Sequence, residues 1–191
     1  SKSIMKNIFR IFNIGVLLAV LSLVSLSCNR GSVEEDDLPQ EDLSNIVLNV
    51  TDLADNKTAV YDYQVNGTAL PNIKLQDGHT YDVSVVFLNG NEDATQEIKS
   101  AKDEHFLVYN FTKSDVALTR TDDASSTRKD GAKVGLKTRW VVNKVQAGAG
   151  TQLILTLYHE PKTVSEAKNG TEWGKQTGGE TDATGQYNIS Q

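Results

Sequence analysis

The chain has little cysteine and little positive charge. Cys28 is the only cysteine among 191 residues, so no disulfide can form within the chain and the folded part must be stabilised by a hydrophobic core. Residues 1–27 hold three of the 19 Lys and Arg residues and none of the 25 Asp and Glu residues, which leaves 16 basic residues and a net charge of −9 for 28–191. That balance argues against nucleic-acid binding, which needs basic surface to neutralise phosphates.

The N-terminal part lacks an apolar run long enough for a membrane-spanning helix. Its uncharged stretch, Ile14–Leu26, has 13 residues, whereas a spanning helix needs ~20. Three basic residues precede this stretch, and small residues follow it just before Cys28. This order is typical of a secretory signal. We therefore predict residues 1–27 to be a cleaved signal peptide.

A cysteine at the cleavage point resembles the lipobox of bacterial lipoproteins, in which the thiol is acylated and becomes the new N-terminus. The resemblance implies that Cys28 is lipidated and anchors the chain to the outer membrane. Residues 28–44 then form a linker, whose acidic block Glu34–Asp37 is expected to be extended and solvated. The block serves as a plain spacer, or it resembles the surface-export signal of Bacteroidota lipoproteins, which implies a domain that faces the cell exterior. With Cys28 lipidated, no thiol remains for catalysis or for binding a metal.

Residues 45–191 alternate apolar and polar side chains with a period of two, and helical periodicity is almost absent. The runs are short, rich in β-branched and aromatic residues, and separated by Gly, Asn and Asp. Strands are predicted around Ile46–Val50, Ala59–Val65, Tyr81–Phe87, Phe106–Phe111, Asp115–Arg120, Val134–Val142, Gln152–Tyr158 and Gln186–Ser190. This pattern predicts a single immunoglobulin- or fibronectin-like antiparallel β-sandwich of about seven to nine strands.

Three polar segments interrupt the strand pattern. Asp93–Lys102 is the one segment that reads as a helix. Thr121–Lys133 holds three aspartates, but their spacing does not match a calcium-binding EF-hand loop, and we interpret the segment as a hydrated hairpin loop. Ser165–Thr184 is rich in Gly, Thr and Asn and includes Trp173. It is either a mobile binding loop or a long surface connection.

No catalytic motif stands out. The chain has no nucleophile elbow, no HExxH pair and no phosphate-binding glycine loop. We therefore predict a protein that is not an enzyme.

The chemistry that remains centres on two histidines. Strand alternation places His105 on the same face as Leu107 and Tyr109, at the start of its strand. His159 lies on the same face as the leucines before it, at the end of its strand. If the two strands are antiparallel neighbours, the imidazoles meet at one rim of the sandwich. Glu104 and Glu160 lie beside them in sequence, and His79 is expected to serve a turn.

Three segments resemble a family of small, largely uncharacterised Bacteroidota lipoproteins often encoded beside TonB-dependent receptors. They are DEHFLVY at 103–109, LTLYHEPKT at 155–163 and GGETD at 178–182. Carried over to this chain, the family's motif positions are His105, His159, Glu160, Glu180 and Asp182. Some relatives are labelled as a type 1 periplasmic-binding fold. That fold is a βα alternation, which a chain with almost no helical period does not support.

Imidazole nitrogens and carboxylate oxygens together suit zinc, copper or iron. Two functions follow as hypotheses. The first is a lipid-anchored surface accessory that binds a transition metal or metal complex for a TonB-dependent uptake system. The second is a structural or adhesion module of the cell envelope with no small-molecule ligand, in which the histidines only hold the rim together.

Overall fold

The computed structural model describes residues 43–191, so Cys28, the predicted signal peptide and most of the predicted linker lie outside the described residues. The first sheet consists of β1 (Asn45–Asp52), β2 (Lys57–Gln64), β4 (Thr80–Asn89), β5 (Glu92–Asp93), β7 (Asp115–Arg120) and β8 (Lys137–Lys144). The second sheet consists of β3 (Asn72–Lys74), β6 (His105–Phe111), β9 (Leu153–His159), β10 (Thr163–Asn169), β11 (Glu172–Thr177) and β12 (Glu180–Ser190).

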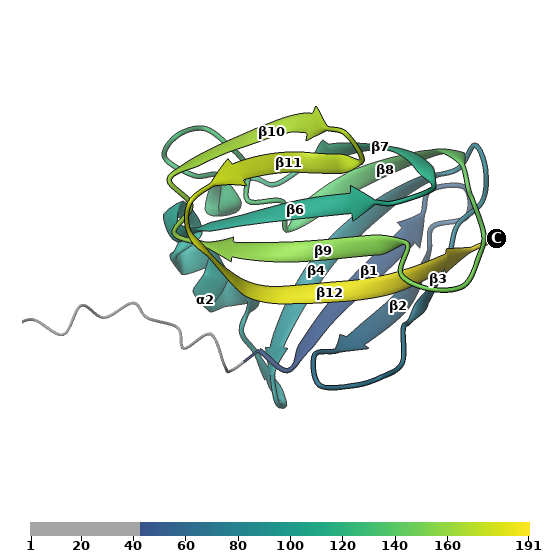
Figure 1. The fold of residues 1–191 in the computed structure, drawn as a ribbon, viewed down its shortest axis with the longest axis horizontal. Coiled ribbons are helices and arrows are strands. Elements are labelled where there is room, and N and C mark those ends of the chain that lie inside the picture. Colours follow the sequence, from purple (N-terminus) through teal and green to yellow (C-terminus); the bar gives the residue numbers. More distant parts are fainter. Residues whose placement is uncertain (1–42) are drawn as a thin grey trace, which may run out of the picture. The chain divides into compact units, whose positions relative to one another are not determined.

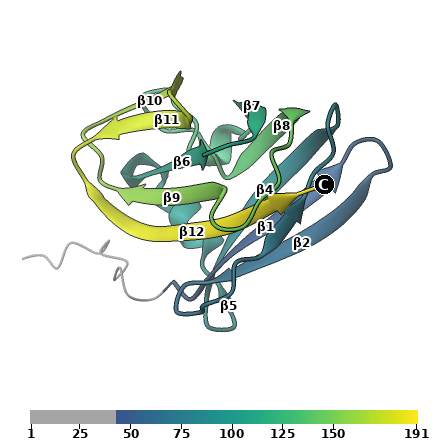
Figure 2. The same cartoon turned by 45° about the vertical axis from the view of Figure 1, so that its right-hand side comes forward.

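The two sheets pack face to face, as Figure 1 and the turned view in Figure 2 show. The strand order is β2-β1-β4-β8-β7 in the first sheet, with β5 beside β4, and β10-β11-β6-β9-β12-β3 in the second. Neighbouring strands are antiparallel except β3, which runs parallel to β12. The predicted all-β sandwich is therefore confirmed, with twelve strands in residues 43–191 where seven to nine were expected.

The core lies between the sheets because each inner strand turns alternate side chains inward. In β4, every second residue from Tyr81 to Phe87 is buried, and β1 alternates in the same way. Trp140 is fully buried at the centre, where the rings of Phe111 and Tyr109 meet it edge-on at centroid distances of 5.1 and 6.4 Å. This tight core supplies the stability that the chain cannot obtain from disulfides.

The prediction of a loop over Ser165–Thr184 is wrong. The segment contains most of β10, all of β11 and the start of β12. β10 is an edge strand whose residues are half-buried or exposed on both faces. A strand that buries neither face needs no apolar alternation, so its sequence resembled a loop. Trp173 of β11 connects the second sheet to the first, since its indole Nε1 donates a 3.0 Å hydrogen bond to the Val116 carbonyl of β7.

The helical segments are short. α2 (Thr95–Ser100) confirms the helix predicted over 93–102, and it buries Ile98 against the core. Two 3₁₀ turns follow, η1 (Lys102–Glu104) and η2 (Ala124–Ser126), the second within the predicted 121–133 loop. Within the part of the chain that the structure describes, no helix has the length and apolarity to cross a membrane.

Arg120, the last residue of β7, ties the first sheet to the second. Arg120 is 4% exposed, and its guanidinium carbon lies 4.2 Å from the Phe106 ring centroid. It donates to the carbonyl oxygens of Lys133, Val134, Leu107 and Trp173 at 2.6–3.2 Å. β11 pairs with β6 only through Glu172–Asn110 and Trp173–Tyr109, and Arg120 bridges the two strands beyond that point.

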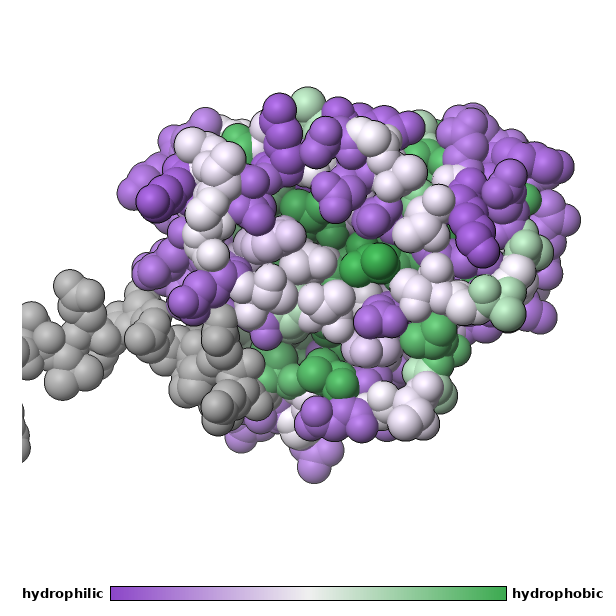
Figure 3. Space-filling view, viewed as in Figure 1, coloured by the Kyte–Doolittle hydropathy of each residue, from purple (hydrophilic) through white to green (hydrophobic). Residues whose placement is uncertain are grey.

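The outer face of the second sheet is mostly of intermediate hydropathy, with small hydrophobic areas near its centre (Figure 3). The hydrophilic residues of this view gather towards its margins. On β9 the outward residues are Ile154, Thr156 and Tyr158, all half-buried.

Candidate functional site

β6 and β9 bring the two predicted histidines together. His105 and His159 are directly opposite in the antiparallel register. Their rings stack with centroids 5.2 Å apart and an interplanar angle of 11°. Both are buried, because each faces the interior on the same side as Leu107 and Leu157. The prediction that the imidazoles meet at one rim of the sandwich is confirmed.

Asp182 lies beside both rings. The pairing of β12 with β9 shifts register between Thr181 and Ala183, and the residue at this irregularity is Asp182. Its side chain is 6% exposed, with Oδ2 3.2 Å from His105 Nε2 and Oδ1 3.4 Å from His159 Nδ1. One buried carboxylate thus pairs with two buried imidazoles.

Hydrogen-bond chemistry places one proton of His105. Its Nδ1 lies 2.9 Å from the carbonyl oxygen of Ala101, and because a carbonyl only accepts, Nδ1 carries a proton. Its Nε2 faces Asp182 Oδ2. His105 Nε2 is thus buried beside one carboxylate oxygen, at a distance longer than its Ala101 contact, and has no hydrogen-bond partner within residues 43–191.

His159 lies between two carboxylates. Its Nδ1 is 3.4 Å from Asp182 Oδ1, and its Nε2 is 3.6 Å from Glu104 Oε2. His159 Nε2 and Glu104 Oε2 are both buried and, like His105 Nε2, have no hydrogen-bond partner within residues 43–191. A ligand atom from each of Glu104, His159 and Glu160 lies within 4.8 Å of the other two. Buried polar atoms without partners are costly, so this set of one imidazole and two carboxylates is a candidate site for a cation.

The residue Glu160 is held in a strained backbone conformation. Its φ is 50°, in the left-handed region that glycine and asparagine favour. Its N–H donates to the Glu104 carbonyl at 2.7 Å. Gly179 packs against this turn so closely that a Cβ there would lie 2.5 Å from the His159 carbonyl oxygen. The fold thus fixes the backbone position from which the Glu160 side chain extends.

Replacing Glu160 with glycine is expected to raise the free energy of unfolding by up to about 1 kcal/mol, because the left-handed backbone no longer opposes a side chain. The same change removes one carboxylate from the cluster, so metal affinity should fall. Thermal denaturation and metal titration measure the two effects. Asn56→Gly is the matched control, since Asn56 has a φ of 56° in the β1–β2 turn. Destabilisation by Glu160→Gly would mean that the side chain has a structural role.

The predicted set is therefore brought together in part. His105, His159 and Asp182 form one group, and Glu160 joins His159 in the cluster of three donors. Glu180 lies opposite His159 in the β12–β9 register, but its side chain is exposed and it is not one of the three donors. Glu104 takes a place in the cluster that sequence alternation did not assign to it. The 3₁₀ turn η1 ends at Glu104 and interrupts the alternation that would have turned its side chain away from His105.

His79 has the turn role that the sequence predicted. Its Nδ1 lies 2.8 Å from Asp52 Oδ2, and its ring stacks on Tyr81. Partial burial acts to raise the pKa of Asp52, but the Ala54 N–H and His79 lower it more, so this pKa is below its usual range. His79 is the third histidine of the chain and serves below as a control.

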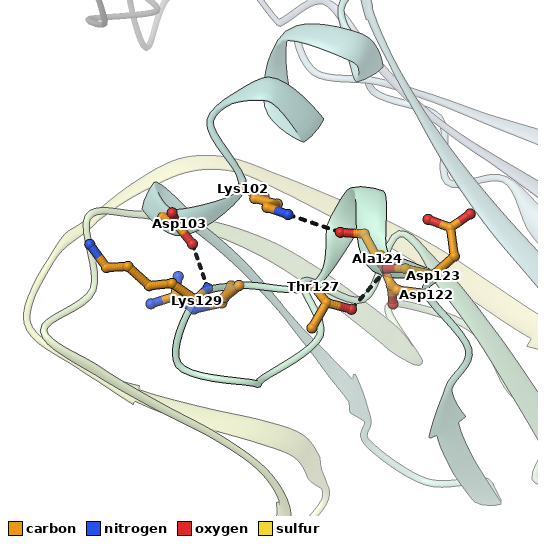
Figure 4. A pocket seen from close by; sticks show the side chains of 8 residues that line it. Lys102, Asp103, Asp122, Asp123, Ala124, Thr127 and Lys129 are labelled. Carbon is orange, nitrogen blue, oxygen red and sulfur yellow. Dashed lines mark hydrogen bonds between the residues drawn. The ribbon is translucent and has the colours of Figure 1, made fainter.

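A second polar site, an open hollow of about 570 Å³, lies against η1 and the 121–133 loop (Figure 4). Its polar groups are engaged within the protein. Lys102 donates to the Ala124 carbonyl, the Lys129 N–H to Asp103, and Thr127 to the Asp123 carbonyl. Asp122 accepts from the N–H groups of Gly135 and Leu136 and from the Ser126 hydroxyl. These aspartates therefore build the loop, as predicted for a segment without calcium-loop spacing.

No family model, curated protein or solved structure matches this chain. Function is therefore inferred from the chemistry of the rim cluster, which we define as Glu104, His105, His159, Glu160 and Asp182.

Proposed function

We propose that this domain binds a transition metal ion between Glu104, His159 and Glu160. The observation that carries the proposal is the buried Nε2 of His159, which has no hydrogen-bond partner and points at a carboxylate. One imidazole nitrogen and two carboxylate oxygens form a donor set that suits zinc, iron or copper.

The residues around His159 support the same role. Histidines that bind metals commonly donate their other ring N–H to a carboxylate, which fixes the tautomer and the ring orientation. Asp182 Oδ1 lies 3.4 Å from His159 Nδ1, where such a carboxylate is needed. The His105 ring, stacked at 5.2 Å and paired with the same Asp182, limits the movement of both.

The cellular setting of the proposal comes from the sequence. Cys28 and the acidic block after it support a lipid-anchored protein on the outer face of the outer membrane. The resemblance in the three rim segments supports a metal-capturing accessory of a TonB-dependent receptor. The net charge of −9 over 28–191 is compatible with the capture of cations.

One observation favours a purely structural role as the second candidate. The close contacts of the Asp182 carboxylate with His105 and His159 join β6, β9 and β12 at their ends without any metal. On this alternative the domain is an envelope or adhesion module, and the cluster contributes only to stability.

Titration calorimetry with zinc and with copper on the purified chain separates the two candidates. We expect one saturable site in the wild type and its loss in His159→Ala, because the only nitrogen donor of the three-residue cluster is removed. His79→Ala is the control and should bind like the wild type. Glu104→Gln, a milder change at a partly exposed side chain, should also weaken binding. The proposal fails if the wild type binds neither metal, or if both cluster variants bind unchanged.

A further inference from the structure

The described residues supply fewer donor atoms than a transition metal accepts. The cluster offers one ligand atom from each of Glu104, His159 and Glu160. Zinc in structural sites has four protein ligands, and sites with three keep a position for water or substrate. Octahedral ions need more donors still. At least one coordination position must therefore be filled from outside this set.

The neighbouring polar groups do not complete the set. Asp182 directs one oxygen to each histidine. His105 is not among the three grouped donors; its Nδ1 lies 2.9 Å from the Ala101 carbonyl oxygen and its Nε2 lies 3.2 Å from Asp182 Oδ2. Asp103 accepts a 2.6 Å hydrogen bond from the Lys129 N–H. Glu180 lies opposite His159 in the β12–β9 register, and its side chain is exposed. A variant of Glu180 therefore forms part of the test below.

The three donors are graded from interior to surface. The side chain of His159 is 9% exposed and that of Glu104 is 33% exposed, while Glu160 is exposed. An ion held by all three is thus enclosed by protein on the His159 side and reaches solvent on the Glu160 side. Its remaining positions therefore face solvent on the side of the exposed Glu160.

We infer that the site takes its metal as a complex with a small oxygen-donor chelator, which fills the solvent-side positions. This inference rests on the proposed function. Two carboxylates neutralise a divalent ion, so an oxygen chelator meets a centre without net negative charge. Metals that accept the carboxylate oxygens of Glu104 and Glu160 also accept oxygen atoms of a chelator. The protein would then bind the complex through three donors and leave the chelator in solvent.

Cobalt substitution tests the inference. Co²⁺ is added to the purified chain, its visible absorption band is recorded, and acetohydroxamate is titrated in as the probe. We expect a saturable change in the band to a spectrum that differs from that of cobalt hydroxamate without protein. Acetohydroxamate should show no binding to the metal-free chain.

The possible failures are distinguishable. If cobalt gives no band, or if His159→Ala gives the wild-type band, the proposed function itself fails. If the band forms but does not respond to acetohydroxamate, the site is closed and the inference is overturned. A response restricted to Glu180→Gln would identify Glu180 as the closing ligand. Removal of cobalt from the protein by the probe, giving the protein-free spectrum, would also overturn the inference.

Discussion

Replacing Arg120 with alanine is expected to lower the free energy of unfolding by about 3–5 kcal/mol, the range for substitutions that break a buried network of charged hydrogen bonds. The guanidinium donates to four backbone carbonyls, and its removal takes a donor from each of them, two in fully buried hydrogen bonds. Burial lowers the pKa of Arg120, while Tyr109, Glu166 and Asp122 act to raise it. A guanidinium nevertheless keeps its charge in proteins, so the carbonyls receive charge-assisted hydrogen bonds.

The space around Arg120 is built for this side chain. A Cβ at Gly135 would lie 2.5 Å from its Nη1, and a Cβ at Gly174 would lie 2.5 Å from its Nη2. Both glycines also have positive φ, at 96° and 100°. Smaller side chains at 120 leave a cavity that these neighbours cannot fill, which adds to the cost of the substitution.

Chemical denaturation measures the loss, and Arg139→Ala is the control. Arg139 forms an exposed bidentate ion pair with Asp82, and such pairs contribute about 0–1 kcal/mol. Hydrogen exchange should show the β11 amides losing protection in Arg120→Ala, because Arg120 holds β11 to β6 beyond their short ladder. A loss no greater than that of Arg139→Ala would contradict this account of Arg120.

Replacing Asp182 with alanine is expected to give the largest effect at the rim cluster. It removes the carboxylate that orients His159, so metal affinity should fall about 10–100-fold, the usual effect of losing a carboxylate that supports a metal-binding histidine. It also leaves the two buried imidazoles without their shared partner, so the thermal midpoint should fall. Calorimetry and thermal denaturation give the two readings on the same sample.

Glu180→Ala is the matched control for Asp182→Ala, because Glu180 lies two residues earlier on β12 with an exposed side chain. It should change neither metal affinity nor stability strongly. A fall in stability of Asp182→Ala with unchanged metal affinity would favour the purely structural role of the cluster. Unchanged stability and affinity would show that the buried contacts of Asp182 have little energetic weight.

Most of the fold could be predicted because the inner strands bury one face. β1 and β4 carry buried apolar residues at every second position, and this pattern is visible without a structure. The β10–β11 hairpin could not be found in this way, since its strands cover little of the core. Arg120 did leave a signal, because it follows Val116 and Leu118 with the alternation of the buried face.

The site could be predicted to the extent that it depends on strand ends. Antiparallel pairing of the start of β6 with the end of β9 brings His105 and His159 together. The positions of Glu104 and Glu160 depend instead on a 3₁₀ turn and on one left-handed residue. Those conformations follow from tertiary packing against Gly179 and the Ala101 turn rather than from local sequence. This is why Glu104 entered the cluster and Glu180 did not.

X-ray anomalous scattering at the zinc edge tests the central claim most directly, on crystals of the chain grown with zinc. The account predicts one strong peak about 2.0–2.2 Å from His159 Nε2 and from carboxylate oxygens of Glu104 and Glu160. Zinc bound at His79 and Asp52, with no peak at the rim cluster, would contradict it.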